Sequence, residues 1–292
     1  MTDTRQPAAS GTFYPEQTEK CLREANQLLE SADISARPDG DIRAGLVPHA
    51  GWVFSGRLAA MTLKTLTATR EPQTVIFFGA DHVGSVHQGE VYDSGSWTTP
   101  LGQARIDTRA AEALLDYGPP FGANRAAHDH EHSIEVQIPI LQALCPNAMI
   151  LPIAVPPTEL AVEIGQALTK ALAQLDYRWV IAGSTDLTHH GGPRFGSPGG
   201  YGQEGLDYSV QNDRNMLDLI EALDAERVIE QARAHRNACG AGAIAATVAA
   251  CRTLGATAGC TLEYTNSHEV MRQIAPGQLD DTTVGYASVV FA

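Results

Sequence analysis

The chain has 292 residues, 43% of them hydrophobic, which suits one large α/β domain with a sizeable core. Its net charge of −14 excludes the basic surface of a nucleic-acid-binding protein and repels anionic membranes, although a local positive pocket for one small anion remains compatible. Five cysteines without a Cys-x-x-Cys pair, no signal-peptide pattern at the start and no uncharged apolar run of roughly 18 residues predict a cytoplasmic protein without a membrane span.

Apolar runs rich in β-forming residues alternate along the chain with segments of helical spacing. Strands are expected at residues 43–48, 74–79, 148–155, 178–184, 261–265 and 283–291. Helices are expected at residues 58–68, 108–117, 132–144, 158–175, 206–223, 225–235 and 240–254. The alternation predicts an α/β fold, a single domain over residues 1–292 with a mainly parallel or mixed central sheet flanked by helices.

Some local features refine this prediction. Residues 89–92 and 96–98 are expected to form a small antiparallel excursion, and Thr108 and Thr158 are expected to cap the helices that follow them. Pro139 predicts a kink or a late start in the helix at 132–144. The glycine-rich segment 191–205 is expected to be a long loop, and such loops are usually functional or mobile.

Four short segments place a metal-binding side chain beside glycine or after an apolar run, and three of them supply the candidate ligands. His49 and His82 follow buried-type strands, and Cys239 precedes a small-residue helix. Because strands of an open parallel sheet deliver their last side chains to one edge, these three residues are expected to converge as metal ligands. Three protein ligands leave an open coordination position, as in catalytic metal sites.

Each ligand has a simpler interpretation when it is taken alone. A single histidine after a strand is more often a hydrogen-bonded loop residue, and Cys239 alone is more often a buried packing residue. The joint placement favours ligands, and the helix N-terminus after Cys239 is expected to favour its thiolate. A thiolate with two imidazoles admits Fe, Cu or Zn.

Asp186 and His189 follow the strand at 178–184 with Asp-x-x-His spacing. The aspartate can orient the histidine, which can then move a proton. The alternative is a turn aspartate that accepts hydrogen bonds from local amides. His190 is expected to point elsewhere.

Residues 128–135 form the densest polar cluster of the sequence. Its His128 and His132 have the spacing of a zinc-protease motif, but the glutamate precedes the second histidine, so the motif fails. The cluster is either a helix-capping segment or a set of residues, His132 and Glu135, that orient ligands or substrate. Trp52 and Tyr14 are further candidates for the pocket wall.

At these residues the sequence resembles the Memo family, whose fold is similar to that of class III, LigB-type extradiol dioxygenases. The motifs that carry the resemblance are Gly-Thr-Phe-Tyr-Pro at 11–15, Val-Pro-His-Ala-Gly at 47–51, Gly-Ala-Asp-His at 79–82, Asp-His-Glu-His-Ser-Ile-Glu at 129–135, Ser-Thr-Asp-Leu-Thr-His at 184–189 and Ala-Cys-Gly at 238–240. They occur in the family's order over nearly the whole chain.

The resemblance implies that His49, His82 and Cys239 bind the metal and that Asp186 and His189 lie across the pocket. His189 would stand in the place of the dioxygenase acid-base histidine. Cys239 stands where the dioxygenases have a carboxylate, which puts ring cleavage itself in doubt. The resemblance further implies iron or copper binding, redox activity and a radical-SAM protein as a pathway partner.

The main hypothesis is therefore a non-haem Fe(II) redox enzyme that acts on a small aromatic or phenolic molecule with dioxygen. A second hypothesis is a non-catalytic module that binds a metal, a peptide or an anion. A third is a zinc hydrolase with Asp186 or Glu135 as its base.

Overall fold

Four parallel strands form the centre of the main sheet in the computed structural model, which describes residues 4–292. They are β2 (Ala44–Val47), β9 (Trp179–Ser184), β3 (Thr74–Gly79) and β8 (Met149–Ala154), in that spatial order. Strand β9 pairs with both β2 and β3, and β3 pairs with β8. Nearly every residue of these strands is buried, because helices cover both faces, which explains their continuous apolar sequences.

Shorter and antiparallel strands extend the sheet on both sides. Beyond β2, β12 (Thr283–Phe291) runs antiparallel and also pairs with β11 (Gly259–Asn266) and β10 (His189–His190). Beyond β8, β4 (Gly89–Val91) is antiparallel and β7 (Phe121–Ala123) follows it. The expected α/β fold with a mixed, centrally parallel sheet is confirmed.

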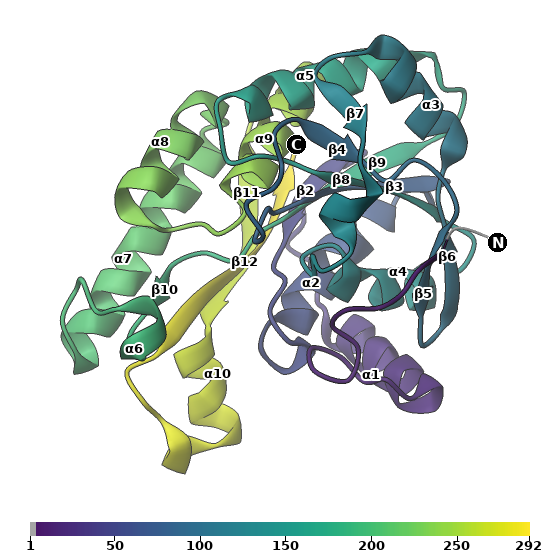
Figure 1. The fold of residues 1–292 in the computed structure, drawn as a ribbon. Helices are drawn as coiled ribbons and strands as arrows, with labels where there is room; N and C mark the ends of the chain where they lie inside the picture. The colour runs from purple at the N-terminus through teal and green to yellow at the C-terminus, as the bar shows by residue number, and fades with distance from the viewer. Residues whose placement is uncertain (1–3) are drawn as a thin grey trace.

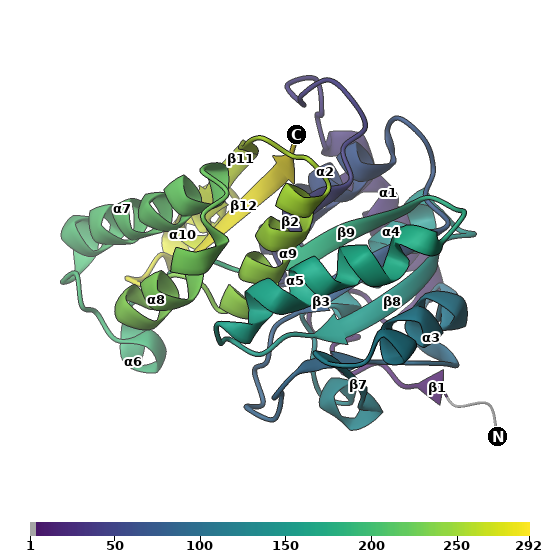
Figure 2. The same cartoon turned by 90° about the horizontal axis from the view of Figure 1, so that it is seen from above.

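The helices form two layers, one on each face of the sheet (Figures 1 and 2). One layer packs around a core that includes Ile76, Leu151 and Ile181, and the other around Val75, Phe77 and Val180, which alternate with them along the strands. The first layer contains α3 (Thr108–Tyr117), α5 (Leu160–Ala171), α7 (Gly202–Glu221), α8 (Ala225–His235) and α9 (Ala241–Thr253). The second contains α1 (Thr18–Ser31), α2 (Trp52–Thr67) and α4 (Ile138–Leu144).

Smaller elements complete the chain. A separate sheet contains β1 (Thr4–Arg5), β5 (Ser96–Thr99) and β6 (Gly102–Arg105). Two short helices, α6 (Gly192–Phe195) and α10 (Ser267–Ile274), lie near β10 and the outer end of β12 (Figure 1). The 3-10 helices are η1 (Arg125–His128), η2 (Glu135–Gln137), η3 (Leu172–Gln174) and η4 (Pro276–Gln278). Within residues 4–292, no helix is both long and apolar enough to cross a membrane.

Several local predictions are corrected by the structure. Strand β4 joins the main sheet and β5 the small one, so the two do not form the expected antiparallel pair. Asp107, not Thr108, caps α3 by accepting a hydrogen bond from the Ala110 amide, and Glu159 rather than Thr158 precedes α5. The expected loop 191–205 contains α6 and the start of α7. Helix α1 was not predicted.

The region around Pro139 agrees with the sequence. Helix α4 starts only at Ile138, after the 3-10 turn η2, so that Pro139 lies in its first turn, where a missing amide hydrogen costs no helical bond. Residues 1–3, which belong to the expected domain and to the start of the chain searched for a signal peptide, lie outside the described residues.

Candidate metal centre

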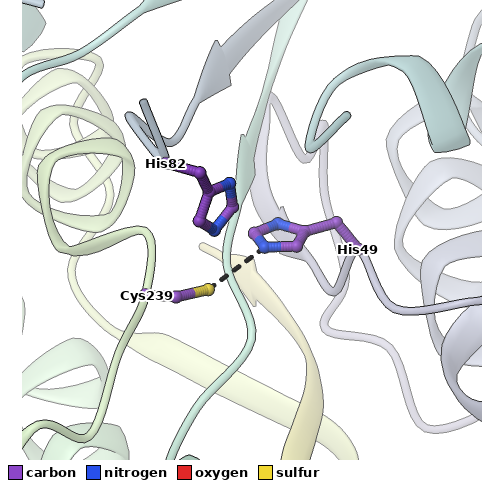
Figure 3. A group of neighbouring side chains, drawn as sticks. All are labelled: His49, His82 and Cys239. Atoms are coloured by element: carbon purple, nitrogen blue, oxygen red, sulfur yellow. Dashed lines mark hydrogen bonds between the residues drawn. The ribbon is translucent and has the colours of Figure 1, made fainter. Parts of the chain in front are cut away.

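Three side chains from separate segments converge at the carboxyl edge of the parallel strands (Figure 3). His49 follows β2, His82 follows β3 and Cys239 precedes Gly240, the residue at the start of α9. One nitrogen of each imidazole and the Cys239 Sγ all lie within 4.8 Å of one another, and His49 Nε2 is 3.1 Å from Sγ. Two imidazoles and a thiol at this spacing can share one metal ion.

The absence of a side chain at Gly240 allows Cys239 to approach the end of β9. A Cβ at Gly240 would lie 2.2 Å from the Ser184 carbonyl oxygen, which is too close for any other residue. The Cys239 amide donates to the Asp186 carbonyl oxygen, and the Asp186 amide donates to Sγ at 3.2 Å. These reciprocal bonds fix the position of the sulfur.

Hydrogen bonds determine which nitrogen of His49 is free to bind a metal. Ser184 Oγ donates its single hydrogen to the Ser133 carbonyl oxygen at 2.7 Å, so it must accept from His49 Nδ1, which is 2.9 Å away. Nε2, which faces Cys239, therefore carries the lone pair. Burial, together with the charges of His82 and His132, holds the pKa of His49 well below its usual value, so this imidazole is neutral.

A buried carboxylate orients His82. Glu131 Oε1 accepts from His82 Nδ1 at 2.9 Å, and its Oε2 accepts from the His82 amide. Burial alone would lower the pKa of His82, but hydrogen bonds with Cys239 and Glu131 outweigh it and raise the pKa to about 10. Burial alone would raise the pKa of Glu131, yet its bonds with His82 hold it well below the usual range. This carboxylate–histidine arrangement is typical of metal ligands.

Burial dominates the protonation of the Cys239 thiol. Burial raises the pKa of Cys239, the Asp186 carboxylate adds to the effect, and the hydrogen bond with His82 opposes it. In the metal-free protein these effects together favour the neutral thiol, against the thiolate that the position of Cys239 before α9 was expected to favour. A metal that binds here must displace protons from Cys239 and His82, as metal binding to a thiol generally does.

A cavity of about 850 Å³ opens above the three ligands, large enough for a small organic molecule. Asp186, His189 and His132 line it together with the ligands. His132 stacks on His82 with a ring separation of 4.8 Å and contacts His49 edge-on at 5.4 Å. The side chains that the sequence placed in two groups thus border one space.

Asp186 does not orient His189 as expected. Its Oδ1 accepts from the His49 amide at 2.7 Å, and the described residues include no hydrogen bond between Asp186 and His189. Burial raises the pKa of Asp186 to about 7. Burial and the charges of His82 and Arg194 lower the pKa of His189 to about 4, so at neutral pH its ring can accept a proton. As expected, His190 is buried away from the cavity and packs near Tyr208.

Glu135, Tyr14 and Trp52 are buried and are not among the residues that line the cavity. Glu135 accepts from Arg5 Nη1, from the Tyr14 hydroxyl and from the amides of Ala8 and Ala9. The Trp52 indole donates to the Val136 carbonyl oxygen. These contacts tie the N-terminal segment to the polar cluster, so all three side chains have protein partners outside the cavity lining.

Several residues of the site were not predicted from the sequence, among them Glu131, Ser184, Arg194 and Arg236. The sequence indicated for Glu131 only that its position does not match the zinc-protease motif. For Ser184 it indicated only the end of a strand. Arg194 and Arg236, which also line the cavity, carry no local sequence signal. The position of Glu131 beside His132, within a cluster rich in histidine, is a signal that could have revealed it, but its choice of His82 as partner depends on the fold.

The chain belongs to the Memo-like protein family, whose model matches residues 5–290. A MEMO1 family protein of Methanopyrus kandleri is 33% identical over 98% of this chain and 98% of its own length. Another, of Thermococcus onnurineus, is 34% identical over 98% of this chain and 99% of its own length. A solved structure of an uncharacterized protein from Escherichia coli K12 covers 86% of this chain and all of its own, with 9% identity and a TM-score of 0.48.

Proposed function

We propose that this protein is a non-haem iron redox enzyme in which His49, His82 and Cys239 hold Fe(II). The observation that carries the proposal is the convergence of the three ligand atoms at a cavity that His189 also lines. The donor set fits a metal, because the hydrogen bonds of Ser184 and Glu131 leave one nitrogen of each imidazole facing the thiol. Fe(II) bound there would supply one-electron and dioxygen chemistry.

The chain's own residues supply binding and proton transfer. His189, neutral at pH 7, would accept a proton from the hydroxyl of a phenolic substrate. Phe13, Phe54 and Phe195 supply apolar walls against which an aromatic ring can pack. His132 would complete the wall beside His82, and Asp186 would hold the His49 backbone in position.

Anaerobic loading with Fe(II), followed by oxygen uptake with a panel of catechols and aminophenols, tests the proposal. Stoichiometric iron with oxygen uptake on at least one substrate, lost in His189→Gln, is the expected result. Stoichiometric metal without turnover on the whole panel would favour a non-catalytic binding module. Metal analysis of anaerobically purified protein distinguishes iron from copper and zinc.

A zinc hydrolase is the weaker alternative. Glu135 is committed to Arg5 and Tyr14 outside the cavity, which leaves Asp186 as the remaining candidate base. The cytoplasmic location and the radical-SAM pathway partner remain predictions, which cell fractionation and co-purification would test.

A further inference from the structure

Two arginines line the cavity without an acidic partner. Arg194 lies in α6 and Arg236 directly follows α8, and both side chains are exposed. Among residues 4–292, neither guanidinium makes an ion pair or a hydrogen bond with a carboxylate. Arg233, one helical turn before Arg236, does pair with Glu159. In a chain with 34 acidic and 20 basic residues, two such arginines on one cavity are a local reversal of the overall charge.

Arg194 is connected to the metal centre through a short series of contacts. Its guanidinium carbon lies 5.2 Å from the centre of the Phe195 ring, and that ring lies 4.9 Å from the ring of His189. Helix α6 begins two residues after β10, which carries His189, so the charge and the acid-base candidate belong to the same short segment. A ligand that reaches His189 is therefore within the field of Arg194.

Arg236 occupies a strained backbone position. Its φ of 52° is in the left-handed region, where glycine or asparagine usually ends a helix, and its amide donates to the Ala232 carbonyl oxygen. Residues other than glycine are uncommon in this region, and strained backbone positions of this kind cluster at functional sites. Arg236 lines the cavity together with Ala238 and Cys239, which follow it closely in the chain.

The rest of the cavity wall suits an anion attached to an apolar body. Asp186 is the one carboxylate among the lining residues in the described chain, and its Oδ1 is bonded to the His49 amide at the floor. Phe13, Phe54 and Phe195 provide the apolar surface. A guanidinium group donates paired hydrogen bonds to two oxygens of one anion, so carboxylates and phosphates are the groups that the two arginines fit.

We propose that Arg194 and Arg236 hold the oxyanion of a small aromatic substrate, a carboxylate or a phosphate, while the ring lies between the phenylalanines and faces the three metal ligands. This assignment names the substrate class of the proposed enzyme and rests on that function for its catalytic meaning. Binding of the anion itself requires neither metal nor turnover, so it can be tested separately.

The test compares benzoate, phenyl phosphate and the neutral analogue benzamide by ligand-observed NMR titration of the metal-free protein. At least one of the two anions is expected to bind about tenfold more tightly than benzamide, and the preference is expected to weaken as salt is raised. The anion that binds more tightly identifies carboxylate or phosphate as the source of the negative charge. Competition between benzoate and phenyl phosphate checks that both occupy one site.

Three variants locate the interaction. Arg194→Gln and Arg236→Gln are each expected to lower anion affinity about tenfold and to leave benzamide binding unchanged. Arg233→Gln, on the same helix that Arg236 follows but outside the cavity, is the matched control and is expected to bind as wild type does. All three side chains are exposed, so circular dichroism should show unchanged folding.

Equal binding of both anions and benzamide would overturn the proposal, as would an anion preference that survives in the Arg194→Gln/Arg236→Gln double variant or is lost in Arg233→Gln. Cys239→Ser separates this proposal from the redox function. If the metal-deficient variant keeps the preference for the anion while iron-loaded wild type shows no oxygen uptake, the arginine site stands and the redox function fails. Turnover without any anion preference would support the redox function and refute the arginine site.

Discussion

The two sides of the cavity are built differently. On the floor, each imidazole ligand has a buried oxygen that fixes its orientation, Ser184 for His49 and Glu131 for His82. On the wall formed by the β10–α6 segment lie His189 and Arg194, and the Arg194 side chain is exposed without a carboxylate partner among residues 4–292. The floor uses its buried hydrogen bonds to hold donor atoms in place, whereas the wall leaves polar atoms free for a ligand.

The contrast separates the residues that set geometry from those that meet a ligand. Metal affinity depends on donor atoms that are arranged before the ion arrives, so the floor must be rigid and satisfied. A group that exchanges protons with substrate, or binds it, must have an unsatisfied atom facing the cavity. Changes to the floor should therefore alter metal binding or folding, and changes to the wall should alter turnover or ligand choice.

The largest effect is expected for the thiol ligand. Cys239→Ala should abolish stoichiometric iron binding, because the two remaining imidazoles leave too few donors to hold the ion. Metal content after anaerobic loading, measured by mass spectrometry, checks this. Cys251→Ala, which removes a buried thiol from α9, should retain metal. Full metal content in Cys239→Ala would remove the thiol from the ligand set.

His189→Gln tests the wall. Turnover should fall by about 10²–10⁴-fold, because general acid-base catalysis contributes about that much, while the metal content stays at the wild-type level. His190→Phe, next to it but buried away from the cavity, should keep both. Loss of metal in His189→Gln would place this residue among the ligands and erase the distinction between floor and wall.

Arg5 tests how the floor is supported. Its guanidinium donates to Glu135 and to the carbonyl oxygens of His128 and Glu131, and its side chain is 1% exposed. Arg5→Met should lower the free energy of unfolding by about 3–5 kcal/mol, since it leaves a buried carboxylate unpaired. Arg57→Met, which breaks the partly exposed pair with Glu263, should cost about 1 kcal/mol or less. Urea denaturation measures both, and equal losses would contradict the argument.

Glu131→Gln should weaken metal binding by about 10–100-fold without removing a ligand, because the amide no longer supports the basicity of His82. Competition with a fluorescent chelator gives the affinity. Glu112→Gln, exposed on α3, is the control. An unchanged affinity in Glu131→Gln would mean that the orientation of His82 comes from packing with His132 alone.

The contribution of Asp213 to folding stability is expected to depend on pH. Asp213 accepts hydrogen bonds from the Thr188 amide and the Tyr264 hydroxyl, and burial raises its pKa to about 6 despite these bonds. Because the folded pKa lies above the usual aspartate value, the stability that this group contributes is fully present below about pH 4 and is lost as pH rises through about 6.

Asp213→Asn should therefore gain stability relative to wild type, by roughly 2 kcal/mol, as the pH is raised from about 4 to about 7. Urea denaturation of both proteins at the two pH values measures the difference. Asp207→Asn, exposed on the same helix, should show no such trend. A constant difference between Asp213→Asn and wild type would show that the carboxyl does not change protonation state in this range.

Local sequence was sufficient to predict the strands at the centre of the sheet and the alternation of strands and helices along the chain. Continuous apolar runs such as those of β3 and β9 are buried on both faces, and this information is contained in the run itself. The glycine-flanked positions of His49, His82 and Cys239 likewise follow from local sequence, since strand ends meet at one edge of a parallel sheet.

The roles of the other polar residues depend on the tertiary structure. Glu131 and Glu135 lie close together in one polar cluster, yet one orients His82 and the other binds Arg5. Their partners are 49 and 130 positions away in sequence. Periodicity and motif spacing report which local face a residue occupies, whereas the pairing of buried charges depends on long-range contacts that form only when the chain packs.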